Sequence, residues 1–303
     1  SMIYYILANP NAGSRKGERS LKLLLPYLEK EGLSYKLFAT EHTGQEASFI
    51  QKILEEKSTE DQLIILGGDG TISLALNALP DDLPFGYIPS GSGNDFARSL
   101  GLSFDPIQAF KNIRQNKTKD FYVIHYKSQS FSGYALNNVG IGLDAAIVKA
   151  TNSGRMKNML NALKLGRLSY FLTALHVLFS KKPFEISVYN MKNAFKFDNA
   201  FLLTFTKHPY FGGGIQIAPE ATNLSKEIHL VELDRYSIPK IFSLIPSVLK
   251  GKHLDNNLFH HSVSTAAAVT PQSVQPVQID GESFTIQAND TLTLTSEKRK
   301  IIC

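Results

Sequence analysis

The 303-residue sequence has almost no cysteine and no tryptophan. Its one cysteine, Cys303, excludes an internal disulfide framework and a thiolate metal cluster. No run of 18 or more apolar residues occurs, so we expect no membrane-spanning helix. The first apolar run, residues 3–7, has the length of a strand and no basic leader, so we expect no secretion signal. Together these absences predict a protein of the reducing cytoplasm.

Acidic residues are missing from one long stretch, residues 145–184, and without its basic residues the net charge of +5 would be negative. The stretch is rich in leucine, phenylalanine and methionine and is predicted to be helical. Such a surface is typical of proteins that dock on anionic lipid, to which each basic group contributes on the order of 1 kcal/mol. A helix packed on its own domain or on a second subunit is the alternative. No nucleic-acid motif accompanies the charge, so we expect no nucleic-acid partner. The basic residues are Lys149, Arg155, Lys157, Lys164, Arg167, Lys181 and Lys182.

The length exceeds that of a typical single core and predicts two domains. Residues 2–122 alternate between apolar strand-like runs and helical patterns, which favours a mostly parallel sheet with helices on both faces. Residues 123–295 contain short runs of alternating apolar and polar residues, which are typical of antiparallel strands. The tail, about residues 296–303, could pack back on the first domain.

The most informative segment is Leu66-Gly67-Gly68-Asp69-Gly70-Thr71, which follows the apolar run of residues 62–65. It places three glycines, an acid and a hydroxyl where a predicted strand passes into a predicted helix. Glycines let backbone N–H groups approach phosphates closely, and a helix N-terminus favours negative charge. An acidic side chain would repel bound phosphates, so it is expected in a phosphate-binding loop only where a divalent cation lies between it and the phosphates. We interpret the segment as a nucleotide-triphosphate loop with a metal-holding Asp69; a plain strand-to-helix turn is the alternative.

Two further loops of small polar residues follow predicted parallel strands. One is Pro89-Ser90-Gly91-Ser92-Gly93-Asn94-Asp95, in which Asn94 and Asp95 are also plausible helix N-caps. The other is Asn9-Pro10-Asn11-Ala12-Gly13. Because the carboxyl ends of parallel strands lie along one edge of an open sheet, where α/β proteins bind ligands, we expect the three loops to converge there.

These loops and three later motifs resemble the bacterial diacylglycerol kinase and lipid kinase family, whose catalytic domain is shared with sphingosine and ceramide kinases. The six segments follow the family's order and cover essentially the whole chain. They are Asn9-Pro10-x-Ala12-Gly13, Gly67-Gly68-Asp69-Gly70-Thr71, Pro89-x-Gly91-Ser92-Gly93-Asn94-Asp95-Phe96-Ala97-Arg98, Asn138-x-Gly140-Ile141-Gly142-x-Asp144, Gly212-Gly213-Gly214-Ile215-x-Ile217-Ala218-Pro219-x-Ala221 and Gln278-Ile279-Asp280-Gly281-Glu282. The resemblance implies an α/β plus β fold. An open, mostly parallel α/β nucleotide-binding domain, residues 2–122, would precede a β-sandwich lipid-binding domain, residues 123–295, that carries the basic helical insertion.

The resemblance also implies that the first domain binds ATP and Mg²⁺. The glycine loops would hold the phosphates with their backbone N–H groups, and Thr71 and Ser92 would add hydroxyls; the family usually has threonine where Ser92 stands. Asp69 would reach Mg²⁺, with Asp95 as its supporting neighbour. For Thr40 an ordinary N-cap role is the alternative. The predicted nucleotide-binding residues are Asn9, Thr40, Gly67, Gly68, Asp69, Gly70, Thr71, Ser92, Asn94 and Asp95.

The segment Asp280-Gly281-Glu282 is the candidate for the catalytic base. By itself, an acid–glycine pair between apolar runs is typical of a hairpin turn. The resemblance instead implies that the segment lies at the domain cleft and removes the proton of the acceptor hydroxyl, as phosphoryl transfer requires. In an extended chain Asp280 and Glu282 would face the same side, so the sequence does not decide which one is the base. Both, together with Asp69, are predicted catalytic residues.

One departure from the family pattern concerns a structural Mg²⁺ in the second domain. After Pro219-x-Ala221 the family usually continues to an Asp-Gly pair that helps to hold this ion. Here the aligned residues are Ser225, Lys226, Glu227 and Ile228. The acid is lost, and a lysine ammonium is expected to take part of the cation's place. We therefore predict that the structural metal is lost, although Glu220 lies nearby.

The predicted activity is ATP- and Mg²⁺-dependent phosphorylation of a lipid hydroxyl, with diacylglycerol as acceptor and phosphatidic acid as product, within phospholipid biosynthesis. Another lipid acceptor, such as a sphingoid base or long-chain alcohol, is one alternative. A catalytically silent lipid- or nucleotide-binding regulator is another. Nicotinamide-dinucleotide kinases share the Gly-Gly-Asp-Gly-Thr loop, but the first and last motifs fit them poorly. With no spanning helix expected, the protein would meet its lipid at the inner face of the membrane, and the resemblance alone implies a homodimer.

Overall fold

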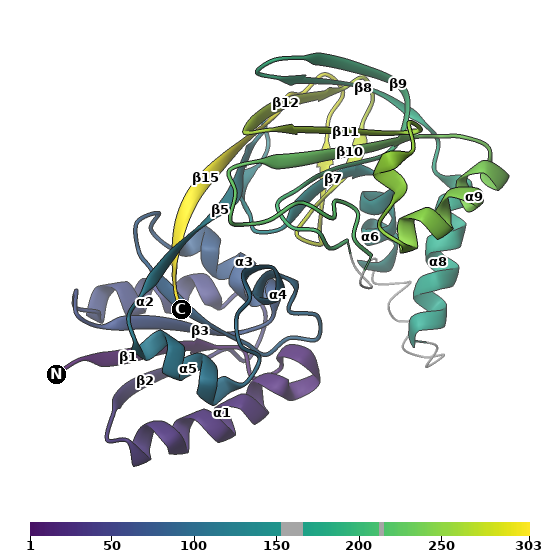
Figure 1. Cartoon of the computed structure of the whole chain (residues 1–303). Coiled ribbons are helices and arrows are strands. Elements are labelled where there is room, and N and C mark those ends of the chain that lie inside the picture. The colour runs from purple at the N-terminus through teal and green to yellow at the C-terminus, as the bar shows by residue number, and fades with distance from the viewer. Residues whose placement is uncertain (153–165, 212–214) are drawn as a thin grey trace. The chain divides into compact units, whose positions relative to one another are not determined.

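The computed structural model describes residues 1–152, 166–211 and 215–303 and divides into two compact units; of residues 166–170 only the backbone is described. The first unit comprises Ser1–Val123, Thr222–Ser225 and Glu297–Cys303, and the second comprises Ile124–Ala221 and Lys226–Ser296 (Figure 1). Three of the predicted basic residues, Arg155, Lys157 and Lys164, lie outside the described residues, as do glycines 212–214 and the side chain of Arg167.

The first unit is built on a parallel sheet, as predicted. Its strands lie in the order β4 (Phe85–Pro89), β3 (Gln62–Gly67), β1 (Ile3–Ala8) and β2 (Ser34–Ala39). Strands β3 and β4 are buried along their whole length, which explains why they are almost continuously apolar rather than alternating. Beyond β4 the sheet gains the end of β15 (Leu292–Ile302), where Ile301 and Ile302 pair in parallel with Phe85 and Gly86.

Helices cover both faces of this sheet. Helix α1 (Ala12–Lys30) presents Leu21, Leu24 and Leu28 at helical spacing, and they pack with α5 (Pro106–Arg114) on the side chains of β1 and β3. Helices α2 (Glu46–Glu56) and α3 (Asp69–Ala78) contact each other and lie on the other face (Figure 1). The short α4 (Asp95–Leu100) follows β4. Helix α3 therefore begins within the glycine loop of residues 66–71, and α4 begins at the end of the loop of residues 89–95.

The second unit is an antiparallel, sandwich-like arrangement around one large core. Strand β9 pairs with β8 near its beginning and with β7 and β10 near its end, so it joins two parts of the sheet. Alternate residues of β8 and β12 are buried, as expected for strands with one face on a core. The strands are the last part of β5 (Thr118–Lys127), β6 (Ser132–Ala135), β7 (Asn138–Gly142), β8 (Phe184–Asn190), β9 (Ala194–Thr206), β10 (Ile228–Asp234), β11 (Phe259–Ser264), β12 (Ala266–Pro271), β13 (Gln275–Ile279), β14 (Glu282–Ile286) and the first part of β15.

The helices of the second unit include α6 (Leu143–Asn152), which begins two residues before the predicted basic helical stretch, and α8 (Gly166–Ser180), which lies inside it. Helix α9 (Ile238–Leu249) buries Leu244 in a second apolar cluster with Leu202, Ile217 and Val231, and a short 3₁₀ turn, η1 (His253–Asp255), follows it. Within the described ranges, no helix combines the length and the apolar character that crossing a membrane would need.

Candidate active site

The structure brings the three predicted loops together at the carboxyl ends of β1, β3 and β4, which are neighbours in the sheet. The backbone N–H of Asn9 donates to the Leu66 carbonyl at 2.9 Å, and that of Ser90 donates to the Gly67 carbonyl at 2.8 Å. The side chain of Asn9 also donates to Thr71 Oγ1 at 3.3 Å. The three loops therefore form one continuous surface of backbone and small side chains.

Two of the glycines are needed because the loops touch one another at their backbones. Gly13 has φ +58°, and a Cβ there would lie 2.7 Å from the Ser90 carbonyl oxygen. A Cβ on Gly91 would lie 2.5 Å from Cα of Gly68. Gly70, beside Asp69, faces open space instead, since a Cβ there would meet no atom within 4 Å. Part of the glycine content thus serves loop packing, and Gly70 leaves room for a ligand to approach the backbone.

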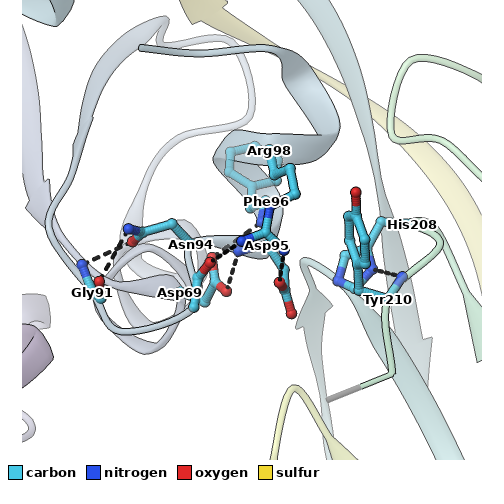
Figure 2. A network of polar contacts seen from close by, with 9 residues as sticks. Asp69, Gly91, Asn94, Asp95, Phe96, Arg98, His208 and Tyr210 are labelled. Atoms are coloured by element: carbon cyan, nitrogen blue, oxygen red, sulfur yellow. Dashed lines mark hydrogen bonds and ion pairs between the residues drawn. The ribbon is translucent and has the colours of Figure 1, made fainter. Parts of the chain in front are cut away.

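Asp69 is the centre of a hydrogen-bond network between the loops (Figure 2). Its carboxylate accepts the backbone N–H groups of Asp95 at 3.0 Å and Phe96 at 3.2 Å. Asp69 therefore caps the N-terminus of α4, although it lies far from that helix in the sequence. The predicted capping role of Asn94 and Asp95 is wrong, because neither side chain bonds the N–H groups at the start of α4.

Asn94 is instead committed to the loop that precedes it. It is buried, has φ +54°, and exchanges two hydrogen bonds with Gly91: the Gly91 N–H donates to Oδ1 at 2.8 Å and Nδ2 donates to the Gly91 carbonyl at 3.0 Å. Asp95 is half-buried and forms an ion pair with Arg98 at 3.3 Å. Burial raises the pKa of Asp95, and the Arg98 guanidinium partly opposes this.

The remaining predicted nucleotide residues have different surroundings. Thr40 is buried, and both its N–H and its hydroxyl donate to the Ala8 carbonyl, at 2.9 and 3.4 Å. It is not an N-cap, because α2 begins six residues later. Thr71 is also buried, whereas Ser92 is exposed. The structure therefore gives Thr40 and Thr71 a role in holding the loops and leaves Ser92 accessible.

Three basic side chains surround a hollow of about 370 Å³ beside the loop of residues 90–94. They are Lys16, Arg19 and Arg98, and Ser92 lies on the same wall. Positive charge beside exposed backbone suits a polyanion such as a nucleotide phosphate chain. Residue patterns did not single out these three, although Arg98 ends the third family motif. A larger hollow, about 490 Å³, lies at the opposite strand ends and contains no predicted site residue.

In the second unit, Asp280 and Gly281 form the two-residue turn of the β13–β14 hairpin. Both have positive φ, 50° and 86°, as a type I′ turn requires, and Ile279 pairs with Glu282 across it. The segment thus forms the hairpin turn that the acid–glycine pair indicates by itself. It is not extended, so the condition under which both acids would face one side is not met. The two carboxylates have different environments.

The Asp280 carboxylate is held by backbone donors. It accepts N–H groups from Leu136 at 2.6 Å, Asn137 at 2.8 Å and Asn138 at 3.1 Å, on the segment that leads into β7. Glu282 is exposed at the first position of β14. Tyr126 is a neighbour that sequence patterns did not reveal: burial, with the negative charges of Asp280 and Glu282, raises its pKa to about 12. Its hydroxyl therefore stays protonated beside the two acids.

The segment aligned with the family's structural Mg²⁺ site contains an ammonium from elsewhere in the chain. Lys207, directly after β9, is fully buried and donates to the Glu227 carbonyl at 2.9 Å and to Ser296 Oγ at 3.1 Å. Burial lowers its pKa to about 7, an effect that Glu227 opposes. Lys226, the lysine of the aligned segment, is exposed. Because Mg²⁺ needs oxygen ligands and an ammonium repels it, this donor set does not fit the ion.

Comparison with known proteins agrees with this geometry. Residues 4–126 match the family described as "Diacylglycerol kinase catalytic domain", and residues 137–292 match "YegS C-terminal NAD kinase beta sandwich-like domain". The chain is 30% identical over 260 residues to the "Putative lipid kinase YtlR" of Bacillus subtilis (strain 168), covering 82% of this chain and 83% of that protein. It is 25% identical over 282 residues to the diacylglycerol kinase of the same organism, covering 91% and 88%. A crystal structure of "a putative diacylglycerol kinase" from Bacillus anthracis str. Sterne has the same fold, with a TM-score of 0.73, 21% identity, and 99% and 94% of the two chains covered.

Proposed function

Because the chain belongs to the diacylglycerol kinase family, we propose that it transfers the γ-phosphate of ATP to the hydroxyl of diacylglycerol and forms phosphatidic acid. As a lipid kinase it is a phosphotransferase with an alcohol acceptor. The observation that carries the proposal is the Asp69 network, which fixes an acid between two glycine loops. Three basic side chains line a hollow beside the second of these loops. Phosphoryl transfer depends mainly on such positioning and charge stabilisation.

The first unit would bind the nucleotide. Gly70 leaves its backbone open to phosphate oxygens, and Lys16, Arg19 and Arg98 would balance their charge. Asn9, Thr40, Thr71 and Asn94 would act by fixing the loops, and Ser92 by direct contact. The proposed nucleotide site comprises Asn9, Thr40, Gly67, Gly68, Asp69, Gly70, Thr71, Ser92, Asn94 and Asp95.

Asp69 and Asp95 have the oxygen ligands that Mg²⁺ prefers, so they fit a metal bound together with the nucleotide. No cluster of three acidic, histidine or cysteine side chains that could hold a metal occurs in the described part of the chain, which favours a site completed by phosphate oxygens. Bound there, Mg²⁺ would neutralise the charge that develops on the transferred phosphate. Asp69 would keep its carboxylate oriented through the two N–H groups of α4.

We assign the catalytic base to Glu282. The Asp280 carboxylate already accepts three backbone N–H groups, whereas Glu282 is exposed and one residue from the turn. A base must be able to take a proton from the acceptor hydroxyl, and a carboxylate engaged in three hydrogen bonds is poorly suited to this. Asp280 would then hold the turn that carries Glu282.

The lipid would be reached at the cytoplasmic membrane surface through α8 and α9. Phe179 and Phe242 of these helices contact each other, with ring centroids 6.3 Å apart, and Figure 1 shows the helices side by side. Six large apolar side chains of the pair are exposed: Phe171, Leu172, Phe179, Phe242, Ile245 and Leu249. Lys240, Lys250 and Lys252 are exposed on or just after α9, and residues 235–254 contain no acid. Apolar area flanked by lysines suits anionic lipid.

The homodimer implied by the resemblance stays a prediction.

Labelled-phosphate transfer tests this proposal. Protein and γ-labelled ATP are mixed with micelles containing diacylglycerol, sphingosine, ceramide or no lipid, with and without Mg²⁺. We expect Mg²⁺-dependent transfer to diacylglycerol alone. Transfer to another lipid would support the proposed phosphoryl transfer from ATP but would show that diacylglycerol is not the acceptor. ATP binding without transfer to any lipid would contradict the proposal and favour a silent regulator.

A further inference from the structure

Asp144, from the fourth family motif, is a buried acid that the reaction as described does not use. It is the second residue of α6 and is 6% exposed. A Cβ on Gly140 would lie 1.7 Å from Asp144 Oδ2, so the carboxylate rests directly on the Gly140 backbone of β7. Burial raises the pKa of Asp144 to about 6, and a hydrogen bond from Gln278 opposes this. The glycine of the motif is therefore explained by the carboxylate that packs on it.

Gln278 connects Asp144 to the turn. It lies opposite Gly140 in the β13–β7 pairing, and its Nε2 donates to Asp144 Oδ2 at 3.0 Å and to Asn138 Oδ1 at 2.8 Å. These two acceptors fix the amide orientation, so that Oε1 points the other way and accepts the Gly281 N–H at 3.0 Å. A reversed amide would place oxygen against two oxygens. Asp144 thus determines which end of Gln278 faces the turn.

The turn is held from several directions. The Asp280 carboxylate binds the segment before β7, Gln278 holds the Gly281 N–H, and Asn152 at the end of α6 donates to the Gly281 carbonyl at 3.3 Å. Glu282 follows directly, as the first residue of β14. Any rotation of the Gly281 peptide would move the backbone from which Glu282 projects.

We propose that Asp144 and Gln278 are positioning residues, which hold the Gly281 peptide in one orientation and thereby fix Glu282 for proton removal. The proposal rests on the function proposed above. Neither residue need touch the substrate. Asp144 and Gln278 would keep the backbone of Glu282 in one position. The Glu282 carboxylate would then start each turnover close to the geometry that proton removal needs.

A double-mutant cycle tests the coupling. Gln278→Glu alone places one carboxylate against another across the 3.0 Å contact. Asp144→Asn combined with Gln278→Glu restores a donor–acceptor pair with the roles exchanged, because Asn138 can turn its amide to donate. Gln275→Glu is the matched control: Gln275 is another buried glutamine of β13, and it accepts from Lys181 Nζ at 2.9 Å, where a carboxylate is tolerated.

We expect Gln278→Glu to lower kcat with diacylglycerol by about tenfold or more, with the KM for ATP unchanged, and the double variant to recover to within about threefold of wild type. The control should keep its kcat. Wild-type kcat in Gln278→Glu, or no recovery in the double variant, would overturn the proposal. If Gln278→Glu does not fold, Asp144→Ala removes the same acceptor and should lower kcat in the same way; unchanged kcat there would also overturn it.

Hydrogen exchange of the Gly281 amide separates this proposal from the proposed function. Exchange should speed up in Gln278→Glu and slow again in the double variant, whether or not any lipid is phosphorylated. If wild type phosphorylates no lipid but exchange follows this order, the function is wrong and the positioning of the turn stands. If exchange at Gly281 is the same in all variants, the positioning itself is wrong.

Discussion

Asp280 and Glu282 are two residues apart and have different chemical surroundings. Glu282→Gln should lower kcat by about 10²–10⁴, the usual contribution of a general base, and leave ATP affinity and the thermal midpoint unchanged. Asp280→Asn should lower the thermal midpoint, because an amide has only one oxygen to offer three N–H donors. Steady-state kinetics, nucleotide titration and thermal unfolding measure the three quantities.

A different outcome would reassign these residues. If Glu282→Gln keeps the wild-type kcat while Asp280→Asn loses activity at an unchanged midpoint, Asp280 is the base and its three hydrogen bonds must open during turnover. Ser283→Ala, at an exposed position next to Glu282, is the control for changes at the start of β14.

Lys207 makes stability depend on pH in a predictable direction. The pKa of its ammonium is about 7 in the folded chain and about 10.5 when unfolded. Between these values the unfolded chain binds more protons, so the contribution of Lys207 to stability rises with pH and is lost as the pH falls through 7. From pH 7 to pH 9.5, the unfolding free energy of wild type relative to Lys207→Met should rise by about 3 kcal/mol.

Urea unfolding of both proteins at the two pH values measures this difference, and the other titrating groups cancel in the comparison. Lys226→Met, at an exposed lysine of the nearby segment, should show no such change. If the difference in unfolding free energy between wild type and Lys207→Met does not depend on pH, the Lys207 ammonium keeps an ordinary pKa in the folded chain.

The predicted loss of the structural metal has its own test. If Mg²⁺ added without nucleotide raises the unfolding free energy of wild type, that prediction is wrong.

At the scale of elements, α9 offers a test of membrane docking. Phe242, Ile245 and Leu249 recur at helical spacing on its exposed face, while Ile241 and Leu244 are buried on the other. Replacing Phe242 and Leu249 by Asp should weaken binding to anionic vesicles at least tenfold, because each large apolar side chain that enters lipid contributes roughly 1.5–3 kcal/mol. Vesicle co-sedimentation at several salt concentrations measures this.

The control for this experiment is Met191→Asp, which replaces a large apolar side chain of the same unit that is 71% exposed and lies outside α8 and α9. It should bind vesicles like wild type. Equal loss in both variants would mean that any added charge weakens binding, and unchanged binding of the α9 variant would move the docking surface elsewhere.

The elements that the sequence predicts well are those with local signals. Each glycine loop follows an apolar run at once, so the residue pattern alone places it at the end of β1, β3 or β4. The cap of α4 has no such signal, because Asp69 lies 26 residues before Asp95, and Asn94 takes a left-handed conformation that turns its amide toward Gly91. Asp280 likewise bonds residues 142–144 positions away, and no local pattern marks them.

At the scale of the whole molecule, the segment Glu297–Cys303 ties distant parts of the sequence into the first unit. Ile301 and Ile302 are buried and extend the sheet beside β4, and Arg299 forms an ion pair with Asp81 at 3.0 Å. Removing residues 297–303 should lower the stability of the first unit by several kcal/mol, since each buried isoleucine contributes about 2–5 kcal/mol. The second unit should keep its stability.

Limited proteolysis with identification of the fragments distinguishes the units, and nucleotide binding reports on the first one. Lys298→Ala, at an exposed position of the same segment, should behave like wild type. Equal protease sensitivity of both units after the truncation would mean that they unfold together.

The pairing of β15 with β4 also has a consequence for biosynthesis. Roughly 200 residues separate β4 from Ile301, and ribosomes add about 5–20 residues per second. The end of β15, which pairs with β4, is therefore synthesised roughly 10–40 s after β4. Throughout that interval the nascent first unit presents the open edge of β4, whose residues are all buried in the complete fold, and such an edge invites pairing with other chains. A chaperone that shields nascent chains would therefore act early in synthesis, long before the second unit and the end of β15 are complete.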